Sequence, residues 1–263
     1  MDQEGKGSWR VHGLSVEGYR HRRTGTPCQD AWQCAVSGPV TALAVADGAG
    51  SRPRSDEGSR LAADLAAERF AQRAARAARA DPDGTAVQLT LREAFADVAR
   101  EFRHRTGDVA DDFATTLTVL VLAPDWLGHL SVGDGFVVLR AGSDGGRPQF
   151  HLLPQPDAVG EYGNETTFLT SYGAEHRLSV QCVRDPEVDG AFLSTDGLAQ
   201  AALTRPGATP NDSFATAVLR SLDRGEILDE DPQLAALLRS DRLTALNGDD
   251  KTLLRAVRPG SGR

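Results

Sequence analysis

The hydrophobic positions along the chain separate into short strand-like runs and two long helical stretches. Residues 40–46, VTALAVA, are almost all apolar, which is typical of a strand covered on both faces. Residues 55–80 and about 86–105 place apolar side chains at helical spacing, with Arg on the solvated side of the first stretch. The sequence DPDG at 81–84 separates the two helices, because Pro and Gly end a helical pattern.

Further strand-like runs lie on both sides of this helical block. The pattern predicts strands at 9–16, 31–36, 40–46, 116–123, 127–132, 136–140, 149–153, 178–183, 190–195 and 252–257. Two more helices are expected near 210–222 and 231–240. Because the turns inside 116–140 are short, the three runs there are predicted to form an antiparallel meander.

The order of these elements favours one class of fold. Strands, two helices, many strands, two helices and a last strand follow one another, which predicts an α+β fold with helices outside antiparallel sheets. No repeat or low-complexity linker divides the chain, so residues 1–263 are expected to form a single domain. Residues 154–177 are polar and rich in Gly and Pro, which indicates a long excursion over the surface.

Composition and charge exclude several classes of function. With 29 Lys and Arg against 37 Asp and Glu, the net charge of −8 argues against a nucleic-acid partner. Three cysteines without a CxxC pair predict reduced thiols and a cytoplasmic location. The first ten residues lack an apolar secretion signal, and no run of about 18 apolar residues predicts a membrane span.

Acidic residues stand at the ends of several predicted strands. They are Asp30, Asp47, Asp134, Asp196 and Asp249, and glycine flanks all but Asp30. A single Asp-Gly is a common turn, and that interpretation stays open for each of them. If the strand ends converge, however, the carboxylates repel one another and raise each other's pKa, and a bound divalent cation removes the conflict. Oxygen ligands of this kind suit Mg²⁺ or Mn²⁺.

Six motifs occur in an order that is characteristic of one family. They are CQDAW, VADGAGS, ATTLTVLVL, SVGDGFVVL, FLSTDGL and GDDKTLL, and they lie between about Ser8 and Val257. In this order the chain resembles the metal-dependent Ser/Thr protein phosphatases of type 2C, and a divergent bacterial branch of that family in particular. The six histidines have no spacing typical of a metal site and are assigned no function.

The resemblance implies a particular fold and metal centre. The fold would be a four-layer α-β-β-α sandwich, in which two antiparallel sheets are flanked by helices. Two divalent cations, Mn²⁺ or Mg²⁺, would lie in its cleft. Asp47 would bridge them, the Gly48 carbonyl would contact one, and Asp196 and Asp249 would hold the second. Asp47, Asp196 and Asp249 would thus be the catalytic residues.

Two further acidic positions are assigned by the same resemblance. Asp30 would act on the second ion largely through water, and Asp134 would support a third metal. Thr115 and Thr116 match a motif with a structural function.

The chain departs from the family pattern at several of these positions. Gln29 replaces an acidic residue, Ala49 replaces a histidine assigned as proton donor in eukaryotic members, and Asp250 replaces an asparagine. The position of the phosphate-binding arginine falls on Gly25, so Arg22 or Arg23 is the nearest substitute. Residues 154–177 coincide with a flap that covers the cleft in the family.

The implied function is hydrolysis of phosphomonoesters on phosphorylated Ser or Thr by attack of a metal-bridging water. The expected partners are a phosphoprotein substrate and a cognate Ser/Thr kinase pathway. A second hypothesis, prompted by Gln29 and Ala49, is a catalytically weak protein that binds a phosphoprotein or kinase as a sensor or scaffold. A third takes ADGAGS as a phosphate-binding turn of a nucleotide-binding protein, but the Gly spacing and lysine of such turns are missing.

Overall fold

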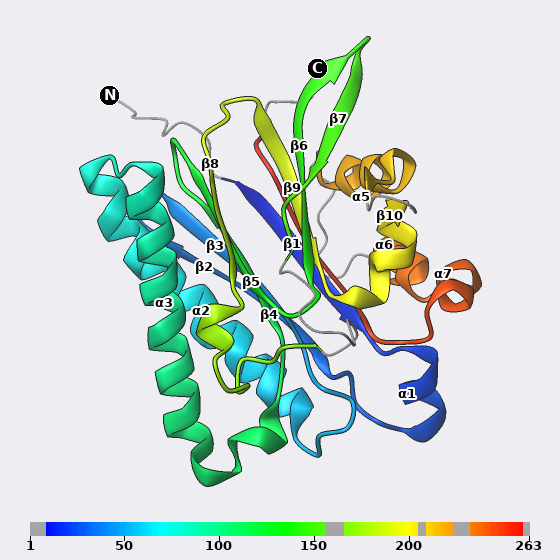
Figure 1. Cartoon of the computed structure of the whole chain (residues 1–263). Helices are drawn as coiled ribbons and strands as arrows, with labels where there is room; N and C mark the ends of the chain where they lie inside the picture. The colour runs from blue at the N-terminus through cyan, green and yellow to red at the C-terminus, as the bar shows by residue number, and fades with distance from the viewer. Residues whose placement is uncertain (1–8, 156–165, 205–208, 224–231, 260–263) are drawn as a thin grey trace.

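Two five-stranded antiparallel sheets lie face to face in the computed structural model, which describes residues 9–155, 166–204, 209–223 and 232–259 (Figure 1). The first sheet has the order β1 (Arg10–Val16), β12 (Lys251–Val257), β9 (Val188–Ser194), β6 (Phe136–Asp144), β7 (Arg147–Leu152). The second has the order β2 (Asp30–Ser37), β3 (Val40–Asp47), β4 (Leu117–Leu122), β5 (Leu127–Val132), β8 (Ser179–Val183).

Helices cover the outer face of each sheet. The long helices α2 (Ser55–Ala77) and α3 (Gly84–Thr106) lie on the second sheet (Figure 1). On the first sheet lie α4 (Ala199–Ala202), α5 (Asp212–Asp223), α6 (Pro232–Leu238) and α7 (Asp241–Leu246). A short ribbon of β10 (Leu203–Thr204) and β11 (Thr209–Pro210) lies among them, and short 3₁₀ turns connect other elements: Ala78–Ala80, Gly107–Phe113, Ala174–His176 and Asp196–Leu198.

Three apolar cores correspond to the three interfaces between these layers. One joins α2 and α3 to the second sheet, one fills the space between the sheets, and one joins the first sheet to α4–α7. The side chains of β3 alternate between two of them: Ala42 and Ala44 face the helices, while Leu43 and Val45 face the opposite sheet. Both faces of this strand are therefore buried, and the predicted α+β sandwich with four layers is confirmed.

The predicted meander is wrong at its third strand. β4 and β5 pair as expected, but β6 pairs with β7 and β9 in the other sheet. The free edge of β5 is taken by β8 instead, so no position beside β5 remains for β6. The turn GDG after β5 thus carries the chain from one sheet to the other, which a short turn does not reveal in sequence.

Other differences from the expected elements are local. The strand predicted at 136–140 continues as β6 to Asp144, and its turn into β7 consists of Gly145 and Gly146, both with positive φ, as in a two-residue hairpin. Two short helices, α1 (Tyr19–Thr24) between the first two strands and α7 before β12, are not among the predicted elements. Of the proposed flap at 154–177, residues 156–165 lie outside the described residues.

No helix within the described ranges has both the length and the apolar character that crossing a bilayer requires.

The start of α2 depends on close packing against the chain that follows α3. A Cβ at Gly58 would lie 2.1 Å from the carbonyl oxygen of Phe113, which is backbone and has little freedom to move. We therefore expect Gly58→Ala to lower the free energy of unfolding by about 1–3 kcal/mol, measured by urea denaturation. Gly84→Ala is the control: its Cβ has its nearest neighbour at 3.9 Å, so its stability should stay within about 0.5 kcal/mol of the wild type or rise. Equal effects of the two substitutions would contradict this explanation.

Candidate metal centre

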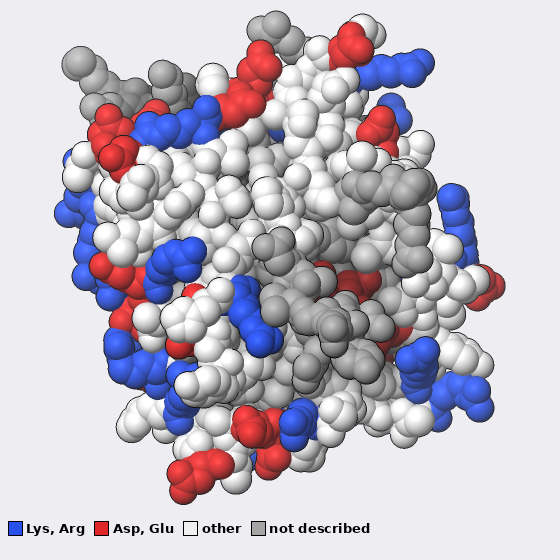
Figure 2. All heavy atoms as spheres, viewed as in Figure 1, with Lys and Arg blue, Asp and Glu red and all other residues white. Residues whose placement is uncertain are grey.

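The acidic strand ends meet around one cavity of about 430 Å³. Figure 2 shows acidic residues in a hollow on one face of the molecule. Five of the predicted site residues line the cavity, namely Asp47, Gly48, Asp134, Asp196 and Asp249. Asp30 is buried in β2 directly opposite Asp47 in the β2–β3 register. The structure thus brings together acidic residues that are up to about two hundred positions apart in sequence.

Hydrogen bonds to the backbone fix the position of Asp47 at the end of β3. Its N–H donates to Oγ1 of Thr116 at 3.0 Å, and its carbonyl oxygen accepts bonds from the Thr116 N–H at 2.8 Å and the Thr115 hydroxyl at 2.9 Å. Both threonines are buried. This pair of threonines therefore holds the main chain of Asp47 on both sides, so the fixed backbone directs the carboxylate toward the cavity.

A close contact of two turns brings Asp196 near the last acidic motif. Asp196 follows β9 and begins a short 3₁₀ turn, while Asp249 precedes β12, the neighbour of β9 in the first sheet. A Cβ on Gly197 would lie 1.9 Å from the carbonyl oxygen of Asp250, so only glycine permits this approach. Asp196 and Asp249 therefore reach the same cavity from the ends of neighbouring strands.

Burial and mutual repulsion raise the pKa of three of these carboxyl groups. The pKa of Asp30 rises to about 8, chiefly because the group is buried, although a 2.7 Å hydrogen bond from the Thr195 hydroxyl opposes the shift. Burial and then the charges of Asp134 and Asp249 raise the pKa of Asp196 to about 6. The pKa of Asp47 rises well above its ordinary value, through burial and then the charges of Asp30 and Asp196.

No basic side chain in the described part of the chain forms an ion pair with any of the five acids. Lys251, which adjoins the last acidic motif in sequence, is buried and donates from Nζ to the carbonyl oxygens of Asn247 and Asp249, both at 2.8 Å. It therefore stabilises the turn before β12 and leaves the carboxylate oxygens without a cation. A cluster of oxygen ligands with this excess of negative charge fits hard divalent cations such as Mg²⁺ or Mn²⁺.

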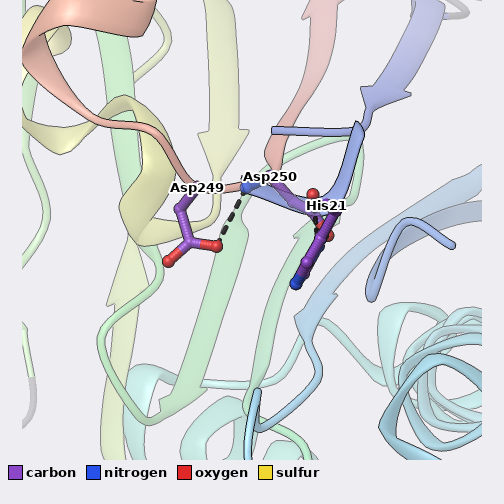
Figure 3. A group of neighbouring side chains, drawn as sticks. All are labelled: His21, Asp249 and Asp250. Atoms are coloured by element: carbon purple, nitrogen blue, oxygen red, sulfur yellow. Dashed lines mark hydrogen bonds and ion pairs between the residues drawn. The ribbon is translucent and has the colours of Figure 1, made fainter. Parts of the chain in front are cut away.

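His21, Asp249 and Asp250 form a second group whose ligand atoms lie within 4.8 Å of one another (Figure 3). Asp250, however, is already satisfied by nitrogen donors. Its Oδ1 accepts the Gly18 N–H and its Oδ2 the Gln29 N–H, both at 2.7 Å, and Nδ1 of His21 lies 2.8 Å and 2.9 Å from its two oxygens. Asp250 is therefore a buried structural carboxylate, and of this acidic pair only Asp249 is left to hold a cation.

Arg22 and Arg23 do not line the cavity. Arg22 donates to the carbonyl oxygen of Glu17 at 2.8 Å, and the guanidinium of Arg23 lies 5.7 Å from the ring centre of Tyr19. The arginine of α1 that does line the cavity is Arg20.

Sequence reasoning missed Arg20 and His21. Both lie on α1, whose six residues contain no apolar repeat that would predict a helix. A signal for this helix does exist at its end, where Gly25 adopts the left-handed conformation typical of a C-cap.

Comparison with known proteins identifies the family of this chain. The family model described as "Protein phosphatase 2C" matches residues 17–239. Serine/threonine-protein phosphatase 3 of Escherichia coli (strain K12) is 33% identical over 262 residues, which covers 95% of this chain and 98% of that protein.

Solved structures share the fold at lower identity. A serine-threonine phosphatase 2C from Toxoplasma gondii has a TM-score of 0.66 at 13% identity, covering 97% of this chain and 96% of that one. A serine/threonine phosphatase from Staphylococcus aureus has a TM-score of 0.62 at 17% identity, covering 99% of each chain. With the fold, the acidic cavity, the family model and the Escherichia coli relative in agreement, this chain belongs to the protein phosphatase 2C family of phosphoprotein phosphatases.

Proposed function

We propose that this phosphatase uses two divalent cations, Mn²⁺ or Mg²⁺, to hydrolyse phosphorylated Ser and Thr side chains of proteins. The observation that carries the proposal is the convergence of Asp47, Asp196 and Asp249 on one cavity without an ion-paired basic side chain among the described residues. Carboxylates held together at such a cost in repulsion gain most from bound cations.

Under this proposal, each acidic residue of the site has its own function in cation binding. Asp47 would contact both cations, the Gly48 carbonyl one of them, and Asp196 with Asp249 the second. Asp30, buried and bonded to Thr195, would act on that ion through water. For Asp134, which is exposed and accepts a 3.0 Å hydrogen bond from Thr166 at the cavity edge, we propose support of a third cation.

When bound, the cations would supply an acidified water to attack phosphorus and would neutralise charge on the phosphoryl oxygens. The side chains of the protein hold the metal ligands and the phosphate in position. Thr115 and Thr116 fix Asp47, and Arg20, which lines the cavity and is always protonated, is suited to orient the phosphate. Arg20 thus takes the function predicted for Arg22 or Arg23.

The relatives and the cysteine chemistry support a proposal for the substrate and the cellular setting. The Escherichia coli protein is named a serine/threonine-protein phosphatase, so we propose a phosphorylated Ser or Thr protein as substrate and a cognate Ser/Thr kinase as the opposing enzyme. All three cysteines are free thiols, which fits a cytoplasmic location. The whole chain would act as one catalytic domain, with 154–177 as a flap beside the cleft.

The metal function of Asp47 can be tested by kinetics. Asp47→Asn should lower kcat/KM for 4-nitrophenyl phosphate with Mn²⁺ by on the order of 10³-fold or more, because the bridging charge is lost. Asp134→Ala, at the exposed edge of the cavity, should lower it by a smaller factor. Thermal unfolding of each variant checks that the fold is intact.

Full Mn²⁺-dependent activity in Asp47→Asn would contradict the proposal. A wild-type protein that binds Mn²⁺ in calorimetry but shows no turnover would favour the alternative function as a sensor or scaffold.

The raised pKa values predict an unusual dependence of stability on pH in the metal-free protein. A carboxyl whose folded pKa is raised holds its proton in the native state after the unfolded chain has released it, so stability falls as pH rises through that interval. In EDTA the free energy of unfolding should therefore decrease between about pH 4 and pH 8, where Asp30 and Asp196 must ionise while buried. The Asp30 contribution should be on the order of a few kcal/mol.

The control for this measurement is Asp30→Asn, which keeps an acceptor for the Thr195 hydroxyl and removes the charge. Its unfolding free energy in EDTA, measured by urea denaturation, should depend less on pH than that of the wild type, and Mn²⁺ should stabilise the wild type most at pH 8. If wild type and variant show the same pH profile in EDTA, burial of an ionisable Asp30 is not a source of instability.

A further inference from the structure

His21 and Asp250 form a hydrogen-bonded pair at the edge of the cavity. His21 lies on α1 and Asp250 directly before β12, so the two are 229 positions apart in sequence. The Asp250 side chain is 3% exposed, whereas that of His21 is 18% exposed and lines the same cavity as Asp47 and Asp196. A buried carboxylate thus supports a histidine that substrate can reach.

The other hydrogen bonds of Asp250 determine whether His21 donates or accepts in its contact with this carboxylate. Both carboxylate oxygens accept backbone N–H bonds, from Gly18 and from Gln29. Because both oxygens of Asp250 act as acceptors in these bonds, Nδ1 of His21 is the donor in its contact with them. Figure 3 shows the ring against Asp250 with the second nitrogen, Nε2, at the end away from it.

This leaves Nε2 as the atom available to a ligand in the cavity. No hydrogen bond from Nε2 occurs within the described residues. A carboxylate on Nδ1 orients the ring, and in the imidazolium form Nε2 carries a proton as well.

Hydrolysis of an alkyl phosphate requires such a proton, because an alkoxide is a poor leaving group. The other groups around the cavity are less suited to supply it. The proposed metal ligands would be bound to cations as anions, Asp250 acts as an acceptor of N–H bonds, and Arg20 does not release its proton. Among the described residues that line the cavity, His21 carries the imidazole, and histidine exchanges protons near neutral pH.

We propose that His21, oriented by Asp250, is the catalytic residue that protonates the leaving oxygen of the substrate. The inference rests on the phosphatase function proposed above and assigns a step within it. The bond from the attacking water oxygen to phosphorus forms as the bond from phosphorus to the Ser or Thr oxygen breaks. The Nε2 proton moves to that oxygen and gives the free hydroxyl. One proton of the attacking water stays on the phosphate, and the other returns to Nε2 through solvent.

Two variants separate proton donation from a structural contribution. His21→Asn places an amide nitrogen where Nδ1 lies, so it can keep the bond to Asp250 while it removes Nε2. His21→Ala removes both. The matched control is His176→Asn, because His176 is 82% exposed and is not among the residues that line the cavity. Thermal unfolding of all three variants shows whether the fold is retained.

The measurement is kcat/KM with Mn²⁺ for phenyl phosphate, whose leaving oxygen needs a proton, and for 2,4-dinitrophenyl phosphate, whose phenolate leaves without one. We expect His21→Asn to lower the rate for phenyl phosphate by on the order of 100-fold, and that for 2,4-dinitrophenyl phosphate by less than about tenfold. A phosphoserine peptide should follow phenyl phosphate. His176→Asn should match the wild type on all three substrates.

Two results would overturn this assignment while leaving the proposed function in place. One is an equal loss on both aryl phosphates, which would make His21 a phosphate contact or a structural residue. The other is an unchanged rate on phenyl phosphate and the phosphopeptide. Wild-type protein that hydrolyses none of the three substrates with Mn²⁺ would overturn the proposed function itself, and this inference with it.

Discussion

The site depends on the repulsion between carboxylates that the fold forces together at the ends of two packed sheets. Asp30, Asp47 and Asp196 are drawn out of water beside further acids, and each has a raised pKa for that reason. No ion pair from the described residues relieves them. Binding of hard divalent cations is the physical solution that this arrangement favours, and the same cations are what hydrolysis of a phosphomonoester needs.

The rest of the structure serves to hold this unfavourable arrangement in place. Three apolar cores between four layers fix the sheets, while Thr115 and Thr116 hold Asp47 by its main chain. Gly197 permits the approach of two turns that no larger residue would allow. The apolar cores, which lie away from the cavity, thus stabilise the fold. The acidic groups of the cavity destabilise the metal-free protein.

Most of the site could be predicted from the sequence, because each acid ends or begins an apolar strand in a motif of fixed type. The strand ends at Asp47 and Asp196 are examples. The α+β class could also be predicted, from the order of strands and helices. What could not be predicted depends on contacts between distant segments. Which strand occupies the edge of β5 decides that β6 crosses to the other sheet. The contact of His21 with Asp250, across 229 positions, gives no signal in the spacing of either residue.

Anomalous diffraction from crystals grown with Mn²⁺ would locate the cations that Asp47, Asp196 and Asp249 are proposed to hold. We expect two strong anomalous peaks in the cavity, with Asp47 in contact with both and with Asp196 and Asp249 in contact with one of them. An empty cavity at saturating Mn²⁺, or peaks confined to the side of His21 and Asp250, would contradict that proposal.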